Sequence, residues 1–376
     1  MAKSIIPVVI SGWEKMKIPL FYKQKPTFGI DIGRGSIKMV QLLEINNTPT
    51  LIGYGFTSFD PSVMDDRGMI TDVEAVAKAA KQLADEQLIG GLVSNSVVAT
   101  VPSAFSYTRT LQLPKMEKKE LDGAVRLEAE QYIPVAIDEL YIDYEVEAAT
   151  SDDSQSQDVF MVAIPNYIVD SYLEVFAALG LEVSAIEPSL SAIVRSVSQS
   201  LELKDTVMVI DLGSRSSDLS VYDGKTIRVT GTTKKGGEDI TDTLIENLNI
   251  TKRQAFHGKA RYGINPDSKQ GREILKHSQP ILDDLILEIK KMQRYYQGRN
   301  NSNDKIGEII ILGGGANMPG LNEFIQKQTD LKVTSFDPWR HIDMGNLQAP
   351  NKLETTLFTN VIGNALVGKT SGAVKK

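Results

Sequence analysis

The chain has 376 residues, of which 41% are hydrophobic and 24% are charged, and its formal net charge is −7 at pH 7. This charge argues against non-specific nucleic-acid binding, and the length predicts two domains or lobes. The absence of cysteine excludes disulfides and thiolate metal sites and fits a reducing cytoplasm, and three histidines disfavour a histidine-based metal centre.

The first 27 residues form an N-terminal arm with an apolar patch between Ile5 and Trp13, which Pro7 interrupts. No stretch approaches the roughly 20 apolar residues that a membrane span needs, and no cleavage site of a signal peptide follows. We expect a loosely packed arm; the alternative is an arm that docks on a partner or a membrane surface.

The first motif is an apolar segment from residue 28 that ends in Asp31 and turns through glycines into a second apolar segment. Gly33 and Gly35 allow positive φ and close backbone approach, so successive amide groups can converge on one anion. Ser36 and Lys38 add a hydroxyl and a cation. Because a carboxylate repels phosphate, Asp31 is expected to bind water of a hydrated Mg²⁺. The alternative is an ordinary β-hairpin.

The same pattern returns in the second half of the chain. An apolar run from residue 207 ends in Asp211, and Gly213 and a small polar turn lead into another apolar run up to residue 222. Two such hairpins that face each other are suited to clamp one polyphosphate. Asp211 is therefore expected to hold metal-bound or attacking water.

Two further glycine loops follow apolar segments. Gly236 and Gly237 precede Glu238, whose carboxylate is suited to a ribose hydroxyl, and a triple glycine begins at Gly313. Glycines remove side chains that would collide with a flat purine ring. The alternative for each loop is a tight connection between a strand and a helix.

The remaining pattern alternates strands and helices, which predicts an α/β fold. Besides the two hairpins, strands are expected at 50–59, 97–101, 105–113, 140–148, 159–164, 226–233 and 309–312. Helices are expected from a capping box at Thr71 and Glu74 to residue 88, at 118–132, at 168–179, at 190–200 with Pro188 opening the helix at a first helical position, from residue 236, through 281–296 and after residue 320. The polar run 150–158 is expected to be an exposed hairpin tip.

Together the four loops resemble the actin, Hsp70 and sugar-kinase ATPase superfamily over nearly all of the chain from residue 28 to about 367. Residues 31–38 look like its phosphate-1 motif, 211–217 like phosphate-2, 313–320 like the adenosine motif and 187–192 like connect-1. The resemblance implies an actin-like ATPase fold with two lobes flanking a nucleotide cleft, and ATP or ADP with Mg²⁺ as cofactors.

The resemblance also implies roles for individual residues. Nucleotide contacts are expected from Gly33, Arg34, Gly35, Ser36, Lys38, Gly213, Ser214, Arg215, Ser216, Gly236, Gly237, Glu238, Lys259, Gly313, Gly314, Gly315, Ala316 and Met318. The metal is expected at Asp31, with Asp211 acting through water. Asp211 and Glu187 are the candidate catalytic residues, and Glu187 either orients water or is a loop acid before Pro188.

Two positions depart from the superfamily pattern. Arg215 stands where a glycine is usual, so its side chain either points outward or contacts phosphate directly. Phe256 or His257 stands where related proteins often have a glutamate near the nucleotide sugar, although Lys259 is present. Purine and ribose contacts are therefore the least supported part of the site.

Segment 98–187 indicates which family within this superfamily the chain resembles most. Its order of strand, helix, strand, strand and helix, with the motifs at 99–103 and 132–134, is similar to the small inserted α+β subdomain (SHS2 type, 1C-like) of FtsA and, more closely, of the PilM family of type IV pilus assembly. That family implies a partner, the cytoplasmic N-terminal peptide of PilN, bound in a groove beside the subdomain. It implies a place at the cytoplasmic face of the inner membrane, held there by that partner, and leaves open further pilus motor or platform partners and self-association.

The expected division of the chain follows these motifs: an arm at 1–27, lobe 1 at 28–97, the inserted subdomain at 98–187, a return to lobe 1 through a connecting helix at 188–204, lobe 2 at 205–353 with a peripheral subdomain at 237–305, and a C-terminal helix returning to lobe 1 with a polar tail at 354–376.

Three functions compete. The leading one is a nucleotide-dependent assembly adaptor with at most slow ATP hydrolysis. A sugar kinase or other phosphotransferase would need a substrate-binding set of residues, and the sequence shows none. An FtsA-like division scaffold normally has a C-terminal amphipathic membrane helix, which residues 370–376 cannot form because they contain one sizeable apolar side chain.

Overall fold

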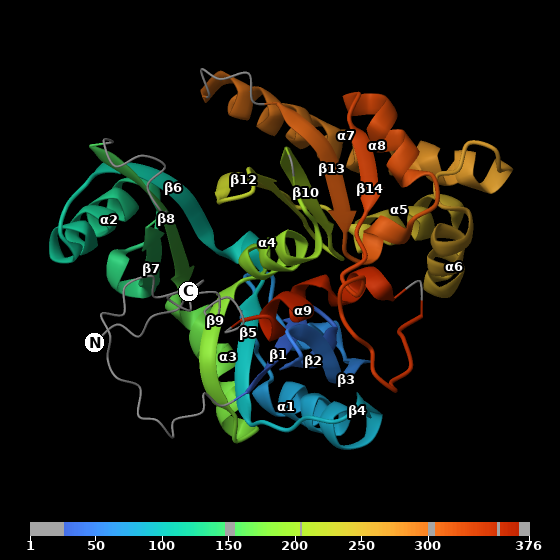
Figure 1. Ribbon diagram of the computed structural model, residues 1–376. Helices are drawn as coiled ribbons and strands as arrows, with labels where there is room; N and C mark the ends of the chain where they lie inside the picture. The colour runs from blue at the N-terminus through green and yellow to red at the C-terminus, as the bar shows by residue number, and fades with distance from the viewer. Residues whose placement is uncertain (1–25, 147–154, 204, 300–304, 352–353, 368–376) are drawn as a thin grey trace. The chain divides into compact units, whose positions relative to one another are not determined.

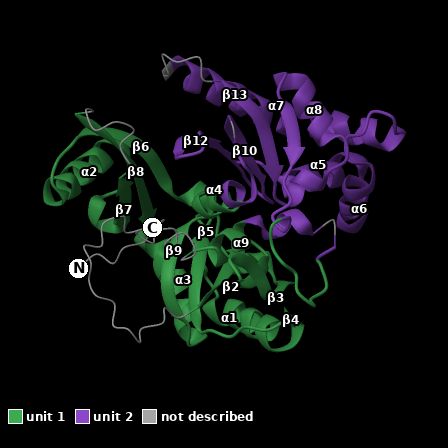
Figure 2. Cartoon of the chain, in the orientation of Figure 1, with its two compact units in different colours: residues 1–196, 341–349, 360–376 green, residues 197–340, 350–359 purple. Residues whose placement is uncertain are grey.

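The computed structural model describes residues 26–146, 155–203, 205–299, 305–351 and 354–367. The chain divides into two compact units, one of residues 1–196, 341–349 and 360–376 and the other of residues 197–340 and 350–359 (Figure 2). The N-terminal arm up to residue 25, most of the expected hairpin tip and the polar tail lie outside the described residues. Within the described part, no helix combines the length and the apolar character that crossing a bilayer requires.

Unit 1 is built on a six-stranded mixed sheet (Figure 1). Its strands, in spatial order, are β4 (Ile89–Gly90), β3 (Thr48–Ser58), β2 (Ser36–Ile45), β1 (Thr27–Gly33), β5 (Ser96–Val101) and β9 (Glu182–Pro188). The neighbours from β4 to β1 are antiparallel, whereas β5 lies parallel to both β1 and β9. The central strand β1 therefore has an antiparallel neighbour on one side and a parallel neighbour on the other.

Alternation along β1 separates an apolar face from a polar one. Phe28, Ile30 and Ile32 are buried in one cluster with α1 (Val73–Gln82) and α3 (Asn166–Ala178). Gly29 lies against α9 (Thr359–Ala365), because a Cβ atom there would be 2.4 Å from the carbonyl oxygen of Val361. Asp31 follows Gly29 by two residues and so shares the face that α9 covers.

Two expected helix starts are wrong. Helix α1 is capped by Asp72, whose side chain accepts a hydrogen bond of 2.9 Å from the amide of Ala75, while Thr71 donates to the carbonyl of Val63 instead of forming a capping box. Pro188 is the last residue of β9, paired with Val101, and α4 (Ser189–Ser200) begins after it. Helix α1 also ends before residue 88, because a π-helical turn, η2 (Leu83–Gln87), follows it.

A separate three-stranded antiparallel sheet lies within the expected inserted subdomain. Its order is β6 (Tyr107–Pro114), β8 (Ser156–Pro165) and β7 (Leu140–Val146). Helix α2 (Lys118–Tyr132) buries Leu121, Val125 and Ala129 in a cluster with the sheet. The predicted strands and helix of this segment are confirmed, and α3, which follows β8, packs with the core of the six-stranded sheet.

Unit 2 repeats the strand order of unit 1. Its sheet runs β12 (Ile227–Thr233), β11 (Ser217–Tyr222), β10 (Thr206–Leu212), β13 (Ile306–Leu312) and β14 (Lys332–Ser335). The first three strands are antiparallel and the last two join in parallel, as in β3, β2, β1, β5 and β9. The repeat seen in the two hairpins therefore extends to both sheets.

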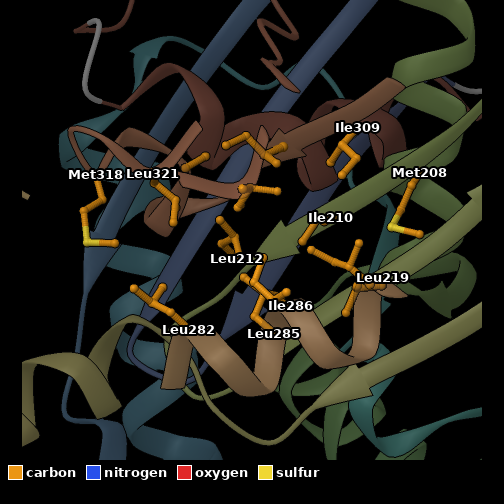
Figure 3. Packing of buried hydrophobic residues seen from close by; sticks show 14 of the residues in the cluster. Met208, Ile210, Leu212, Leu219, Leu282, Leu285, Ile286, Ile309, Met318 and Leu321 are labelled. Atoms are coloured by element: carbon orange, nitrogen blue, oxygen red, sulfur yellow. The ribbon is translucent and has the colours of Figure 1, made fainter. Parts of the chain in front are cut away.

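The core of unit 2 lies on the face of its sheet that α7 (Lys269–Arg299) covers. Ile210 and Leu212 of β10 pack in one cluster with Leu282 and Leu285 of this helix (Figure 3). Helices α5 (Gly237–Leu248), α6 (Lys252–Tyr262) and α8 (Leu321–Thr329) contribute to the same cluster. Because side chains alternate along β10, Asp211 projects to the other face.

Candidate functional site

In unit 1, the carboxylate of Asp31 is held by donors from three elements. Lys38, directly opposite on β2, donates from Nζ to Oδ2 at 2.8 Å, and both side chains are largely buried. Asn360 of α9 donates from Nδ2 to Oδ1 at 2.7 Å, and Thr100 of β5 donates to the same oxygen at 3.3 Å. Each carboxylate oxygen accepts about two hydrogen bonds, so Oδ2 retains room for one water molecule.

The turn between β1 and β2 is formed differently from the expectation. Neither Gly33 nor Gly35 has a positive φ, and a Cβ atom at either would lie at least 3.6 Å from its neighbours. The amide of Gly35 closes the turn by donating to the carbonyl of Gly33 at 2.9 Å. The amide of Arg34 has no acceptor among the described residues, while its guanidinium pairs with Asp66 at 2.8 Å on the surface. One backbone donor is thus available at this turn.

In unit 2, Asp211 lies between a second carboxylate and a glycine loop. Asp218 of β11 is its cross-strand partner in the hairpin, and a Cβ atom at Gly313 would lie 2.2 Å from Oδ1 of Asp211. Gly313 has φ 82° and ψ 177°, a combination open essentially to glycine alone. The loop therefore passes directly against the carboxylate, and glycine is needed for both reasons.

Asp218 is a site residue that the sequence motifs did not single out. It is 6% exposed and accepts a hydrogen bond of 2.7 Å from the hydroxyl of Thr232. Burial raises the pKa of Asp218 to about 6, although the hydrogen bond from Thr232 opposes this shift. A signal was present, because the register of the predicted hairpin places residue 218 opposite Asp211.

The turn 213–216 presents unsatisfied backbone donors. Among the described residues, the amides of Ser214, Arg215 and Ser216 have no acceptor. Consecutive amides of this kind form the concave nests that bind anions. A Cβ atom at Gly213 would lie 2.8 Å from the carbonyl oxygen of Ser216, so glycine is required by close approach and not by a positive φ.

Helix α5 supports this turn from its N-terminus. The amide of Gly237 donates to the carbonyl of Gly213 at 2.9 Å, and that of Glu238 donates to Ser214 at 2.7 Å. A Cβ atom at Gly236 would collide with Ser214 at 2.5 Å, and the amide of Gly236 donates to Asp239 at 2.8 Å. The amides of Gly237 and Glu238 therefore fix the turn, while that of Gly236 caps its own helix.

The side chain of Arg215 lies on the acidic first turns of α5. Its guanidinium contacts Asp242 at 2.7 Å, Glu238 at 3.0 Å and Asp239 at 3.7 Å. Glu238 also pairs through its other oxygen with Lys252 at 3.4 Å. The carboxylate expected to take a ribose hydroxyl is therefore occupied by two cations.

Lys259 ties α6 to α5. Its Nζ donates to the carbonyl of Gly237 and, at 2.9 Å, to the hydroxyl of Thr241. Burial lowers the pKa of Lys259 to about 8, although Glu238 and Asp242 oppose this shift. The neighbouring Phe256 is 58% exposed.

The triple glycine begins a short 3-10 turn, η5 (Gly314–Asn317). A Cβ atom at Gly315 would lie 2.8 Å from that of Leu212, and one at Gly314 would lie 3.2 Å from the side chain of Leu357. Ala316 and Met318 are buried in the core of unit 2. Their side chains therefore support the loop, and its backbone is the part left to face a ligand.

Glu187 is fully buried in a bidentate ion pair. Both of its oxygens accept hydrogen bonds of 2.6 Å from Arg195 of α4, and this guanidinium also donates to the carbonyl of Gly363 at 2.9 Å. This ion pair favours a structural role for Glu187, as an acid before Pro188, over a role in orienting water.

No ready-made metal cage lies in the part of the chain that the structure describes, since no group of three or more histidine or acidic side chains there is arranged to hold a metal ion. Direct coordination by several carboxylates therefore does not fit. A hydrated Mg²⁺ does fit, because it needs one or two carboxylates to hold its waters. Asp31 and Asp211 are suited to that task, because each lies at the edge of a turn with at least one amide that has no acceptor among the described residues.

Comparison with known proteins points to one family. A sequence model described as type IV pilus assembly protein PilM matches residues 29–367. The cell division protein FtsA of Enterococcus faecalis (strain ATCC 700802 / V583) is 24% identical over 373 residues, covering 89% of this chain and 81% of FtsA.

Solved structures agree on the fold. The PilM-PilN type IV pilus biogenesis complex matches with a TM-score of 0.79 and 22% identity, over 92% of this chain and 98% of the other. MreB 5 of Spiroplasma citri, crystallised with AMPPNP, matches with a TM-score of 0.50 and 13% identity over 93% and 97%. The fold is therefore actin-like, as predicted.

Proposed function

The chain belongs to the family of the type IV pilus assembly protein PilM, and from this premise we propose that it is an actin-like adaptor that binds ATP or ADP and the cytoplasmic N-terminal peptide of PilN. In this proposal the bound nucleotide alters the binding of PilN and so couples nucleotide state to assembly of the inner-membrane platform. Support comes from the family match over nearly the whole chain and from the likeness to the PilM-PilN complex.

The turn 213–216 carries the nucleotide part of the proposal. Its three amides without acceptors in the described chain, fixed from behind by α5, are suited to the phosphates. The amide of Arg34 adds a donor in unit 1. Asp31 and Asp211 would hold the waters of Mg²⁺, which neutralises phosphate charge when bound.

We propose at most slow hydrolysis. Phosphoryl transfer to water needs a residue that positions the water, and the oxygens of Glu187 are both engaged by Arg195. Asp211 is the remaining candidate. A faster phosphotransferase and an FtsA-like division scaffold, given the FtsA relatives, are the competing functions.

The proposed location is the cytoplasmic face of the inner membrane, reached through PilN and with no nucleic acid involved. Other pilus motor or platform proteins and further copies of this chain are proposed as additional partners. A sedimentation experiment with vesicles that carry PilN tests this: the chain should pellet with them and stay in solution with bare vesicles.

The metal role of Asp31 is tested by Asp31→Ala. Calorimetry should show that the variant binds Mg·ATP at least about tenfold more weakly than the unaltered chain, which corresponds to about 1.4 kcal/mol. When Mg²⁺ is chelated, the variant and the unaltered chain should bind ATP with similar affinity. The control is Asp66→Ala, which removes only an exposed partner of Arg34. Unchanged affinity of the Asp31 variant in Mg²⁺ would contradict the role.

The role of Asp211 is tested by Asp211→Asn, which keeps the shape of the side chain beside Gly313. Residual turnover or its Mg²⁺ dependence should fall while the folded apo protein persists, as judged by circular dichroism. An unchanged hydrolysis rate would remove Asp211 from the mechanism.

The PilN proposal is tested by removing most of the three-stranded sheet while leaving its two buried members of the unit 1 core, Val162 and Ile164, in place. Thr108 and Val162 face each other in β6 and β8, so a short Gly-Ser turn in place of residues 109–161 can join them. The variant should lose capture of a PilN N-terminal peptide and keep its affinity for nucleotide. Retained capture would place the PilN groove elsewhere.

A further inference from the structure

The strongest unassigned feature is the contact between Arg215 and α5. One guanidinium, 42% exposed, lies within 4 Å of three carboxylates, those of Glu238, Asp239 and Asp242. The same residue supplies one of the three amides in turn 213–216 that have no acceptor in the described part of the chain. The backbone of Arg215 is therefore available to an anion, while its side chain is engaged by the acids of α5.

The acidic residues are useful to α5 but unfavourable to a nearby anion. Asp239 accepts the amide of Gly236, and acidic side chains stabilise the first turn of a helix. However, like charges repel, and they repel more strongly near a protein surface than in bulk water. Three uncompensated carboxylates beside turn 213–216 would thus oppose phosphate binding.

Arg215 resolves this conflict. It brings a positive charge to the three carboxylates, and it joins the turn to α5 alongside the backbone bonds from Gly237 and Glu238. Lys235 and Lys252 reach single members of the cluster, Asp239 at 3.8 Å and Glu238 at 3.4 Å. Only Arg215, among the described cations, contacts all three acids.

We propose that Arg215 is a positioning residue for the anion site: its side chain offsets part of the negative charge of α5 and holds turn 213–216, and the phosphates bind to the backbone amides and not to the guanidinium. This inference rests on the proposed nucleotide binding. The sequence left open whether the side chain of Arg215 points outward or contacts phosphate directly, and the proposal chooses the first.

Calorimetry with Mg·ADP at low salt tests the charge role. Arg215→Ala should weaken binding about tenfold, and adding Glu238→Gln and Asp242→Asn should restore most of the affinity, because the repulsion is removed with the cation. Arg228→Ala, which breaks the 2.6 Å pair with Asp223 on the same sheet, is the matched control and should bind normally. A triple variant as weak as Arg215→Ala would overturn the charge role, as would an unaffected Arg215→Ala.

Hydrogen exchange in the nucleotide-free protein tests the tether separately. The amides of Gly237 and Glu238 should exchange at least about tenfold faster in Arg215→Ala and in the triple variant, and normally in Arg228→Ala. Unchanged exchange would overturn the tether. If the unaltered chain binds neither Mg·ADP nor Mg·ATP, the proposed function fails, while this measurement still decides whether Arg215 holds the turn.

Discussion

The hairpins β1–β2 and β10–β11 have the same sequence pattern and the same place in sheets of the same order, yet the residue opposite the aspartate carries a positive charge in the first and is a second carboxylic acid in the other. In the first, the cation Lys38 lies inside the hairpin and pairs with Asp31. In the second, the residue opposite Asp211 is another carboxylic acid, Asp218. The nearby cation, Arg215, belongs to the turn, and its side chain points away from the two aspartates to the acids of α5. A repeated motif therefore preserves the backbone more faithfully than the electrostatics.

The turns of the two hairpins differ in the same sense. Turn 33–36 closes on itself and leaves one amide, that of Arg34, without an acceptor in the described chain, whereas turn 213–216 leaves three and is braced by α5. The second hairpin thus offers more backbone donors to an anion. The first is the more rigid place for a carboxylate, because Asn360 and Thr100 also hold Asp31.

The largest expected effect contrasts the glycines beside the two aspartates. Gly313→Ala should cost at least about 3 kcal/mol of unfolding free energy, because its φ and ψ suit only glycine and its Cβ would collide with Asp211. Gly33→Ala should cost less than about 1 kcal/mol, since its Cβ would be 3.7 Å from the nearest atom. Urea unfolding measures both. Equal losses of unfolding free energy would show that the loop beside Asp211 does not need glycine more than the turn beside Asp31 does.

The second prediction removes the cation from inside the first hairpin. Lys38→Met should lower the unfolding free energy by about 2 kcal/mol, because it leaves the largely buried Asp31 without its counter-charge. Adding Asp31→Asn should recover most of the loss. Arg34→Ala, which breaks an exposed pair, should change stability by less than about 0.5 kcal/mol. A double variant no more stable than Lys38→Met would argue that packing, and not charge, dominates.

Much of the fold could be predicted because it is encoded locally. Apolar runs, turn residues and helical spacing are properties of short segments, and the predicted bounds of α2 coincide with the observed ones. The errors arose where a distant part of the chain decides. Thr71 bonds to Val63 rather than to its own helix, and Pro188 is held in β9 by pairing with Val101.

The site was predictable in its turns and less so in its side chains. The motifs placed Asp31, Asp211 and the four glycine loops, but charge partners come from distant segments. Asn360, which donates to Asp31, lies 329 residues away in the sequence, and Arg195 donates to both oxygens of Glu187. The positive φ expected at Gly33 is instead found at Gly313, since loop conformation depends on what packs against it.

The smallest expected effect concerns the carboxylate that only the second hairpin contains. Burial raises the pKa of Asp218 to about 6 from 3.8, so between these values the folded state binds more protons than the unfolded state. Stability from this group is therefore fully present below about pH 4 and is lost as pH rises through about 6.

Asp218→Asn removes this titration and keeps an oxygen that can accept from Thr232. The variant should be more stable than the unaltered chain at pH 7 by about 1 to 2 kcal/mol, less than the full value of the shift because the amide also needs a second hydrogen-bond partner. The advantage should shrink as pH falls to 4, as urea unfolding at several pH values would measure. An advantage of Asp218→Asn that is the same at pH 4 and pH 7 would mean that Asp218 does not titrate in this range, and that the charge contrast between the two hairpins is smaller than their geometry suggests.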